Sequence, residues 1–306
     1  MGLRRGLATG RFEPSKVVFI TLIGASLLGA AFYLGLRAGV ERNAAFRFTT
    51  AVTANIERSV SVTAGEFVST LRARPTHFLQ LSRYWGEGVT VNDPANNQDD
   101  LILISGFFKD SNELRLIRRN GAIVARWPVR FFNLFPDPDY FPPGLEPASE
   151  WNIDLHGAVA LPDGSVVFNF EFGGLAKLDR CGNAVWTLRR QTHHSVERAE
   201  GGGFWVPGRR LVLGQTSPYP PFETPIREDT ILKVSDEGQV LDERPVAKVF
   251  YDNELEALLT AFGSVYRQQT EWGQEIVHLN KIEELTADIA GDFPMFEAGD
   301  LSLIHI

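Results

Sequence analysis

Three histidines stand at matching places in a repeated sequence pattern, and together they could do chemistry. His156, His194 and His278 each open a segment in which apolar and polar residues alternate, as in a β-strand. After the first two, a glycine-containing turn and a second apolar segment follow. A neutral imidazole nitrogen is nucleophilic near pH 7. In repeat folds one position of each unit lines a shared axis, so we expect these histidines to meet at one site.

Structural and metal-binding interpretations compete with this one. A single histidine at a strand start is more often a structural hydrogen-bonding residue than a catalyst, but three at equivalent positions bring the two interpretations level. Metal binding by the three is conceivable, yet no His-x-His pair or carboxylate at ligand spacing supports it. We therefore expect no metal and no cofactor. His193 should face the side of its strand opposite to His194.

Short apolar segments separated by Gly, Asn and Asp turns must position these histidines, and the segments fall into repeats. Hairpin signals such as Asn120-Gly121 and Asp163-Gly164 join them. Four short antiparallel strands of this kind make one blade of a β-propeller. The predicted strands are 88–91, 101–105, 114–118 and 122–127 in the first repeat, 156–161, 166–170, 175–178 and 184–188 in the second, and 194–197, 203–206, 230–234 and 240–244 in the third. Trp127, Trp186 and Trp205 fall at comparable positions and should pack one blade against the next.

A fourth repeat begins at His278, and the sequence ends before its outer hairpin. A propeller needs closure, because an open edge strand invites aggregation. We therefore predict an all-β fold with about three and a half blades and interpret the chain as C-terminally truncated. The last residues resemble a translated adapter tail, so His305 receives no functional role.

Three insertions interrupt the repeats. The proline-rich segments 135–147 and 213–227 predict long loops, which in compact repeat folds are more often functional than decorative. Asn253 to Gln268 has the spacing of an amphipathic helix.

The N-terminal part predicts a membrane anchor. Val17 to Leu36 is an uncharged apolar run long enough to span a bilayer, and basic residues precede it. The positive-inside rule places the N-terminus in the cytoplasm and residues 38 onward on the outer side of the inner (cytoplasmic) membrane. A cleaved signal peptide is the alternative, since Gly29-Ala30-Ala31 offers small residues. The predicted divisions are a tail (1–16), a transmembrane helix (17–37), a helical juxtamembrane stalk (38–84) and a partial propeller (85–306).

Composition excludes several classes. The 306 residues include 44% hydrophobic residues and 28 glycines, which indicates a globular, turn-rich chain. A net charge of −8 argues against nucleic acid as a main partner. Cys181 is the single cysteine, so no intramolecular disulfide can form.

The histidine motifs resemble those of the bacterial arylsulfotransferases. The resemblance rests on His193-His194 with its glycine turn, on the His-x-Asn pair of His278 and Asn280, and on His156 with its Leu-Pro-Asp-Gly turn, and it covers roughly residues 85–300. Members are six-bladed periplasmic β-propellers that transfer a sulfuryl group from an aryl sulfate to a phenol, by a ping-pong route through a histidine. The resemblance implies catalytic roles for His278 and His194.

Asn280, His156 and Arg210 are then expected to bind substrate, because sulfuryl oxygens gather negative charge during transfer. Arg209 and Arg210 would alternatively be solvated at a strand end. The family's nucleophilic histidine and channel arginine would follow Leu301, so the nucleophile has no assigned residue. The full-length protein would then be a sulfotransferase, and this fragment would be inactive.

Two other functions remain open at this point. A non-catalytic propeller, tethered by the anchor and stalk, could bind a ligand or partner at the outer face of the membrane. A quinoprotein-like dehydrogenase ranks third, because the tryptophan-docking repeat of those propellers is not evident. Blade number, oligomeric state and the identity of donor and acceptor are not predicted.

Overall fold

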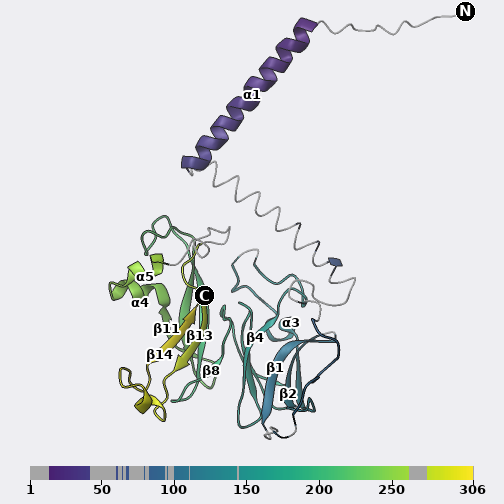
Figure 1. The fold of residues 1–306 in the computed structure, drawn as a ribbon, viewed down its shortest axis with the longest axis vertical. Helices are drawn as coiled ribbons and strands as arrows, with labels where there is room; N and C mark the ends of the chain where they lie inside the picture. The colour runs from purple at the N-terminus through teal and green to yellow at the C-terminus, as the bar shows by residue number, and fades with distance from the viewer. Residues whose placement is uncertain are drawn as a thin grey trace, which may run out of the picture. The chain divides into compact units, whose positions relative to one another are not determined.

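A computed structural model describes residues 14–41, 83–93, 100–109, 111–142, 145–261 and 274–305, with single residues 60, 64, 67, 68, 79 and 95 between them. The chain divides into two compact units, Met1–Val60 and Ser61–Ile306. Most of the predicted stalk lies outside the described residues. The second unit consists mainly of antiparallel sheets with few helices, and no closed propeller is formed among its described residues (Figure 1).

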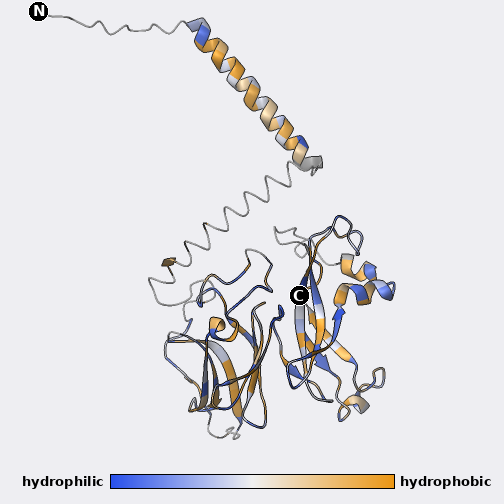
Figure 2. Ribbon diagram, turned by 180° about the vertical axis from the view of Figure 1, so that it is seen from behind, coloured by the Kyte–Doolittle hydropathy of each residue, from blue (hydrophilic) through white to orange (hydrophobic). Residues whose placement is uncertain are grey.

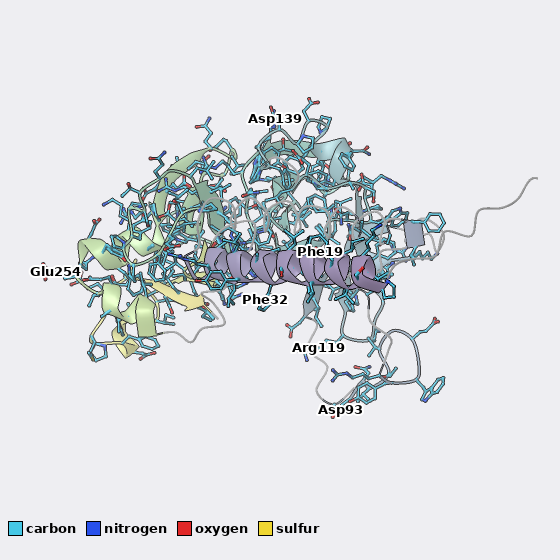
Figure 3. The ribbon with its side chains drawn as sticks, turned by 90° about the horizontal axis from the view of Figure 1, so that it is seen from above. Phe19, Phe32, Asp93, Arg119, Asp139 and Glu254 are labelled. Carbon is cyan, nitrogen blue, oxygen red and sulfur yellow. The ribbon has the colours of Figure 1, made fainter. Side chains whose placement is uncertain are left out.

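The first unit contains helix α1, Pro14–Glu41. Its segment Pro14–Ala38 is long and apolar enough to cross a membrane, and apolar residues cover it along its length (Figure 2). Phe19 and Phe32 project from it and are 64% and 74% exposed (Figure 3). Because water does not favour such exposed apolar side chains, the helix is suited to lipid or to another apolar environment. The sequence prediction of a helix over 17–37 agrees with these bounds.

The first sheet has three strands, β1 Leu101–Phe108, β2 Ser111–Arg118 and β3 Ile123–Val129, in the order β1-β2-β3. The predicted strand 88–91 is not formed. Val89 and Val91 are exposed, so alternation in that segment has no core to face. The first repeat therefore supplies three strands instead of four.

The second sheet contains the four strands that the sequence predicts: β4 Leu155–Ala160, β5 Val166–Phe170, β6 Gly174–Leu178 and β7 Ala184–Leu188. They pair in sequence order, and each pair is antiparallel. β5 is buried at every residue, because sheets pack on both of its faces.

The third sheet has longer central strands than the sequence predicts, and one additional strand. Its strands are β8 Glu197–Arg198, β9 Phe204–Val212, β10 Ile226–Val234 and β11 Val240–Pro245, and β12 Gln274–Glu275 adds to β10 in parallel. His194 precedes β8 and does not open a strand as predicted. Its φ of 51° is left-handed, which is incompatible with extended backbone.

The last sheet pairs β13 Leu279–Glu284 with β14 Leu301–His305. The sequence predicts no functional role for His305, the last residue of β14. In the structure Leu301 and Leu303 pack against the buried cluster that includes Leu279 and Ile282. The segment therefore takes part in the fold.

Short helices occupy the connections. They are α3 Phe131–Leu134, α4 Val246–Asp252, α5 Glu256–Ala261 and a 3-10 turn at Ala290–Asp292. α5 accounts for residues 256–261 of the helix predicted over 253–268. Residues 253–255 are not helical, since Glu254 has a left-handed φ of 59°, and residues 262–268 lie outside the described residues. Within the predicted loop segment, Phe135 stacks on Phe131 in the core and Phe141 meets Phe131 edge to face.

Successive sheets are joined by the tryptophans that the sequence places at matching positions. Trp127 of β3 donates its ring N–H to the Asp179 carbonyl at 3.0 Å, and Trp186 of β7 donates to the Asp236 carbonyl at 2.8 Å. Trp205 of β9 reaches the Glu284 carboxylate at 2.8 Å. Each indole thus bonds to the neighbouring sheet, and the predicted packing role is confirmed.

Candidate functional site

Three histidines from distant parts of the sequence converge, as the repeat pattern predicts. His156 lies in β4, His194 precedes β8, and His278 precedes β13. The rings of His156 and His194 stack with centroids 4.6 Å apart and an interplanar angle of 15°. The rings of His194 and His278 meet edge to face at 5.0 Å. The structure therefore brings these predicted site residues together.

Hydrogen bonds fix the relative positions of the rings. The Nε2 atoms of His194 and His278 are 2.9 Å apart, and Asn280 Nδ2 lies 3.1 Å from His194 Nε2. The backbone N–H of His194 donates to His156 Nδ1 at 3.0 Å. His194 is thus held at its backbone by one predicted residue and at its ring by two others.

Gly157 in β4 allows the backbone of His194 to lie close against β4. A Cβ atom at this position would lie 2.0 Å from the carbonyl oxygen of His194, which no side chain could tolerate. Ser195, which follows His194 in the chain, donates its backbone N–H to the Asn280 carbonyl at 3.2 Å. The segment carrying His194 is therefore placed between β4 and β13.

A charged network that the sequence analysis did not assign lies behind His278. Its Nδ1 lies 2.9 Å from Glu275 Oε1, and Glu275 also pairs with Arg209 and, at 3.2 Å, with Arg227. Arg209 Nε donates to Asp229 Oδ1 at 2.8 Å, and both side chains are almost fully buried. A carboxylate on each side of Arg209 balances its buried charge.

Asp229 and His193 complete the buried side of the site. Asp229 Oδ2 accepts the backbone N–H of Leu279 at 2.7 Å, directly after His278. His193 is fully buried, its Nε2 lies 3.6 Å from Asp229 Oδ1, and its ring packs on Phe172. Neither ring nitrogen has a hydrogen-bond partner within the described part of the chain.

Electrostatics keep several of these groups in one protonation state. Burial, together with the neighbouring histidines, lowers the pKa of His194 to about 3, so this ring is neutral at pH 7. Burial likewise lowers the pKa of His156 and of His193. Burial opposes ionisation of Glu275, but the hydrogen bond to His278 and the charges of Arg209 and Arg227 outweigh it, so its pKa lies below the ordinary value.

Part of this charged network has a signal in the sequence. Arg209 faces Asp229 across the β9–β10 pair, and Arg210 faces Glu228 at the next register position. Opposite charges at facing positions of a predicted hairpin indicate cross-strand pairs. Glu275 lies three residues before His278, a spacing that by itself indicates nothing about contact.

Arg210 lies apart from the histidines. Neighbouring residues of a strand point to opposite faces, so Arg210 pairs with buried Glu228 while Arg209 faces the histidine network. Arg210 lines a cleft of about 530 Å³ together with Tyr140, Phe141, Arg189, Arg190 and Glu243. Asp139, at the molecular surface near this cleft, pairs with Arg189 (Figure 3). Substrate binding by Arg210 stays a prediction.

Asp154, His156 and Glu171 form the one group among the described residues whose donor atoms, all within 4.8 Å of one another, could hold a metal ion. His156 Nδ1 already accepts the His194 N–H, so the proton of the neutral ring is on Nε2. A metal would have to compete with that bond for the single lone pair. Asp154 and Glu171 form the carboxyl pair of this group.

We expect this carboxyl pair to make stability depend on pH. Burial and the Glu171 carboxylate raise the pKa of Asp154 to about 7, so the folded chain binds a proton that the unfolded chain releases near pH 4. Stability from this group is therefore full below pH 4 and is lost as pH rises toward 7. Asp154→Asn should raise the free energy of unfolding at pH 8 by roughly 1–2 kcal/mol, and change it little at pH 4.

Urea unfolding at the two pH values measures this difference. Asp252→Asn, at an exposed site beside Lys248, is the matched control and should shift both values alike. A loss of stability in Asp154→Asn at pH 8 would contradict the assignment.

Comparison with known proteins gives one family match. Residues 157–304 match the family model described as arylsulfotransferase (ASST), a segment that contains His194, His278 and Asn280 and begins one residue after His156. A search of curated proteins found no match.

Two solved structures are similar to part of the chain. A protein of unknown function from Bacteroides caccae has 17% identity and a TM-score of 0.28 over 47% of this chain and 39% of that one. BamB from Moraxella catarrhalis has 12% identity and a TM-score of 0.22 over 48% of this chain and 47% of that one. The matched regions span less than half of either protein.

Proposed function

Because residues 157–304 match the arylsulfotransferase (ASST) family model, as expected of an ASST-like family member, we propose that the protein transfers a sulfuryl group from an aryl sulfate to a phenol. The cluster of His194, His278 and Asn280 supports this proposal most directly. No other part of the described chain brings so many of the predicted site residues within hydrogen-bond distance of one another.

The cluster offers what a sulfuryl group needs. Charge builds up on the sulfuryl oxygens as the bond to the leaving oxygen breaks, so fixed N–H donors stabilise the transition state. Asn280 Nδ2 and the His278 ring converge on one point, now occupied by His194 Nε2. A sulfuryl oxygen at that point would accept hydrogen bonds from both Asn280 and His278 in place of His194. The His194 lone pair would then be released.

The reaction proceeds in two balanced steps. A histidine nitrogen attacks sulfur, the S–O bond to the aryl group breaks, and the phenolate leaves and takes up a proton from water. The acceptor phenol then attacks sulfur and gives its proton to water, and the N–S bond breaks. His278 and His194 serve this chemistry as catalytic groups, and Asn280 binds the sulfuryl oxygens. His156 holds the His194 backbone.

The membrane-anchored propeller architecture belongs to the same proposal. The antiparallel sheets would be blades of a six-bladed propeller, and α1 would be an uncleaved anchor with the sheets on the periplasmic side. Alkaline phosphatase fused after residue 306 should then be active in cells. An inactive fusion of full length would place the sheets in the cytoplasm.

The function is tested with p-nitrophenyl sulfate as donor and phenol as acceptor, using the full-length membrane protein in detergent. Phenol-dependent release of p-nitrophenol together with formation of phenyl sulfate supports transfer. Release that does not depend on phenol indicates hydrolysis. Saturable binding of the aryl sulfate without any release would favour the non-catalytic binding module, and the absence of both binding and release would rule out the proposal.

A further inference from the structure

His278 has a fixed partner at each ring nitrogen, and the two partners together determine its charge. We infer that Glu275, held by Arg209 and Arg227, keeps His278 as an imidazolium whose Nε2–H points at the sulfuryl position. Glu275 is thus a positioning residue, one that acts on substrate through His278. The charge state is a property of the chain alone, and only its catalytic consequence rests on the proposed function.

In the contact between His278 Nδ1 and Glu275, the histidine must be the hydrogen-bond donor. Glu275 is flanked by two guanidinium groups and is ionised, because their charges and the hydrogen bond to His278 outweigh its burial. An ionised carboxylate only accepts hydrogen bonds. Nδ1 of His278, at 2.9 Å from Glu275 Oε1, therefore carries a proton.

The Nε2 side requires a donor as well. Asn280 Nδ2 can only donate, so His194 Nε2, at 3.1 Å, is an acceptor and has no proton. His278 Nε2 lies 2.9 Å from that same atom. Two unprotonated nitrogens would face each other with their lone pairs, so the proton belongs to His278. With both nitrogens protonated, His278 is a cation paired with Glu275.

The surrounding charges are compatible with this assignment. The titratable groups around His278 are His156 on β4, His193 and His194 before β8, Arg209 on β9, Arg227 and Asp229 on β10, and Glu275 itself. The other three histidines are kept neutral by burial, so they add no positive charge. Arg209 and Arg227 are balanced by Asp229 and Glu275, and the imidazolium completes a network of three cations and two carboxylates that an anionic sulfuryl group would neutralise.

The network also fixes where the cation points. Arg209 connects Glu275 to Asp229, and Asp229 accepts the backbone N–H of Leu279, next to His278. The His278 ring and its backbone are therefore held by the same set of ion pairs. A charged donor held this way is roughly twice as strong as a neutral one.

The test is nitrogen NMR of the full chain in detergent, labelled with ¹⁵N-histidine, with the His278 signals assigned by their loss in His278→Gln. At pH 7 we expect both His278 nitrogens at imidazolium shifts in the unchanged chain. In Glu275→Gln the imidazolium signals should be lost, and in Glu275→Asp they should be largely retained. Glu283→Gln, which removes the same charge from an exposed position on β13, should leave them unchanged.

A neutral His278 in the unchanged chain at pH 7, or an imidazolium that persists in Glu275→Gln, would overturn the inference. Binding of p-nitrophenyl sulfate separates this result from the proposed function. If the inference and the function both hold, Glu275→Gln should bind the aryl sulfate about tenfold more weakly and Glu275→Asp should recover most of the affinity. If the imidazolium signals are lost in Glu275→Gln but no variant binds the aryl sulfate, the inference is retained and the proposed function is rejected.

Discussion

Replacing His278 by alanine is expected to lower kcat/KM for p-nitrophenyl sulfate by about 100- to 1,000-fold, which is the usual cost of one fixed donor to a developing oxyanion. The substitution removes the ring that contacts His194 at 2.9 Å and leaves Glu275 without its hydrogen-bonded partner. Phenol-dependent p-nitrophenol release measures the effect. Because the donor acts on charge that develops during transfer, kcat should fall more than the affinity for the aryl sulfate.

Asn280→Ala should reduce the same rate by a smaller factor, about tenfold or more, since it removes a neutral donor at the same point. Asn183→Ala provides the matched control, because the Asn183 side chain bonds to Asp179 in an exposed turn. It should leave the rate within about twofold, as expected for a surface change. A rate in His278→Ala equal to that of the control variant would remove His278 from the site.

Arg209→Met should destabilise the chain more than any other single change considered. The substitution leaves Asp229 fully buried without its hydrogen-bonded counter-charge and removes one partner of Glu275. Removing one member of a buried ion pair typically costs about 3–5 kcal/mol, because an uncompensated charge stays in the interior. Urea unfolding at pH 7 measures this loss.

The stability deficit of Arg209→Met should also depend on pH, in a direction set by Asp229. Burial opposes ionisation of Asp229, but Arg209 and His193 outweigh it and hold its pKa well below the ordinary value. Its contribution to stability is therefore present above about pH 4, the ordinary carboxyl pKa, and is lost as pH falls below it. In Arg209→Met the carboxyl can protonate, so the deficit relative to the unchanged chain should be largest at pH 7 and should shrink toward pH 4.

Arg190→Met is the matched control for this prediction. Arg190 pairs with Glu243, and both side chains are partly exposed to solvent. Exposed pairs contribute about 0–1 kcal/mol, since water screens them. Equal losses in the two variants, or a deficit in Arg209→Met that does not change with pH, would show that Asp229 does not depend on Arg209.

Local sequence patterns predicted most of the strands because each pattern coincides with burial. The alternation and turns of 166–170, 175–178 and 184–188 match β5, β6 and β7, where Val166, Phe168 and Phe170 enter a shared core. The pattern failed at 88–91, whose apolar residues meet no core, and it missed that 301–305 pairs with β13. Pairing with a strand distant in sequence leaves no local signal.

The convergence of His156, His194 and His278 was determined by sequence, because repeats of equal construction place equivalent residues at equivalent positions. Tertiary structure alone decided the backbone conformation, the contacts and the charge of those residues. The left-handed backbone of His194 and its close approach to Gly157 place its ring against His278, and strands β9, β10 and β12 of the third sheet contribute the ion pairs behind it. Charge state depends on neighbours in space, and the neighbours of His278 come from positions 156 to 275 of the chain.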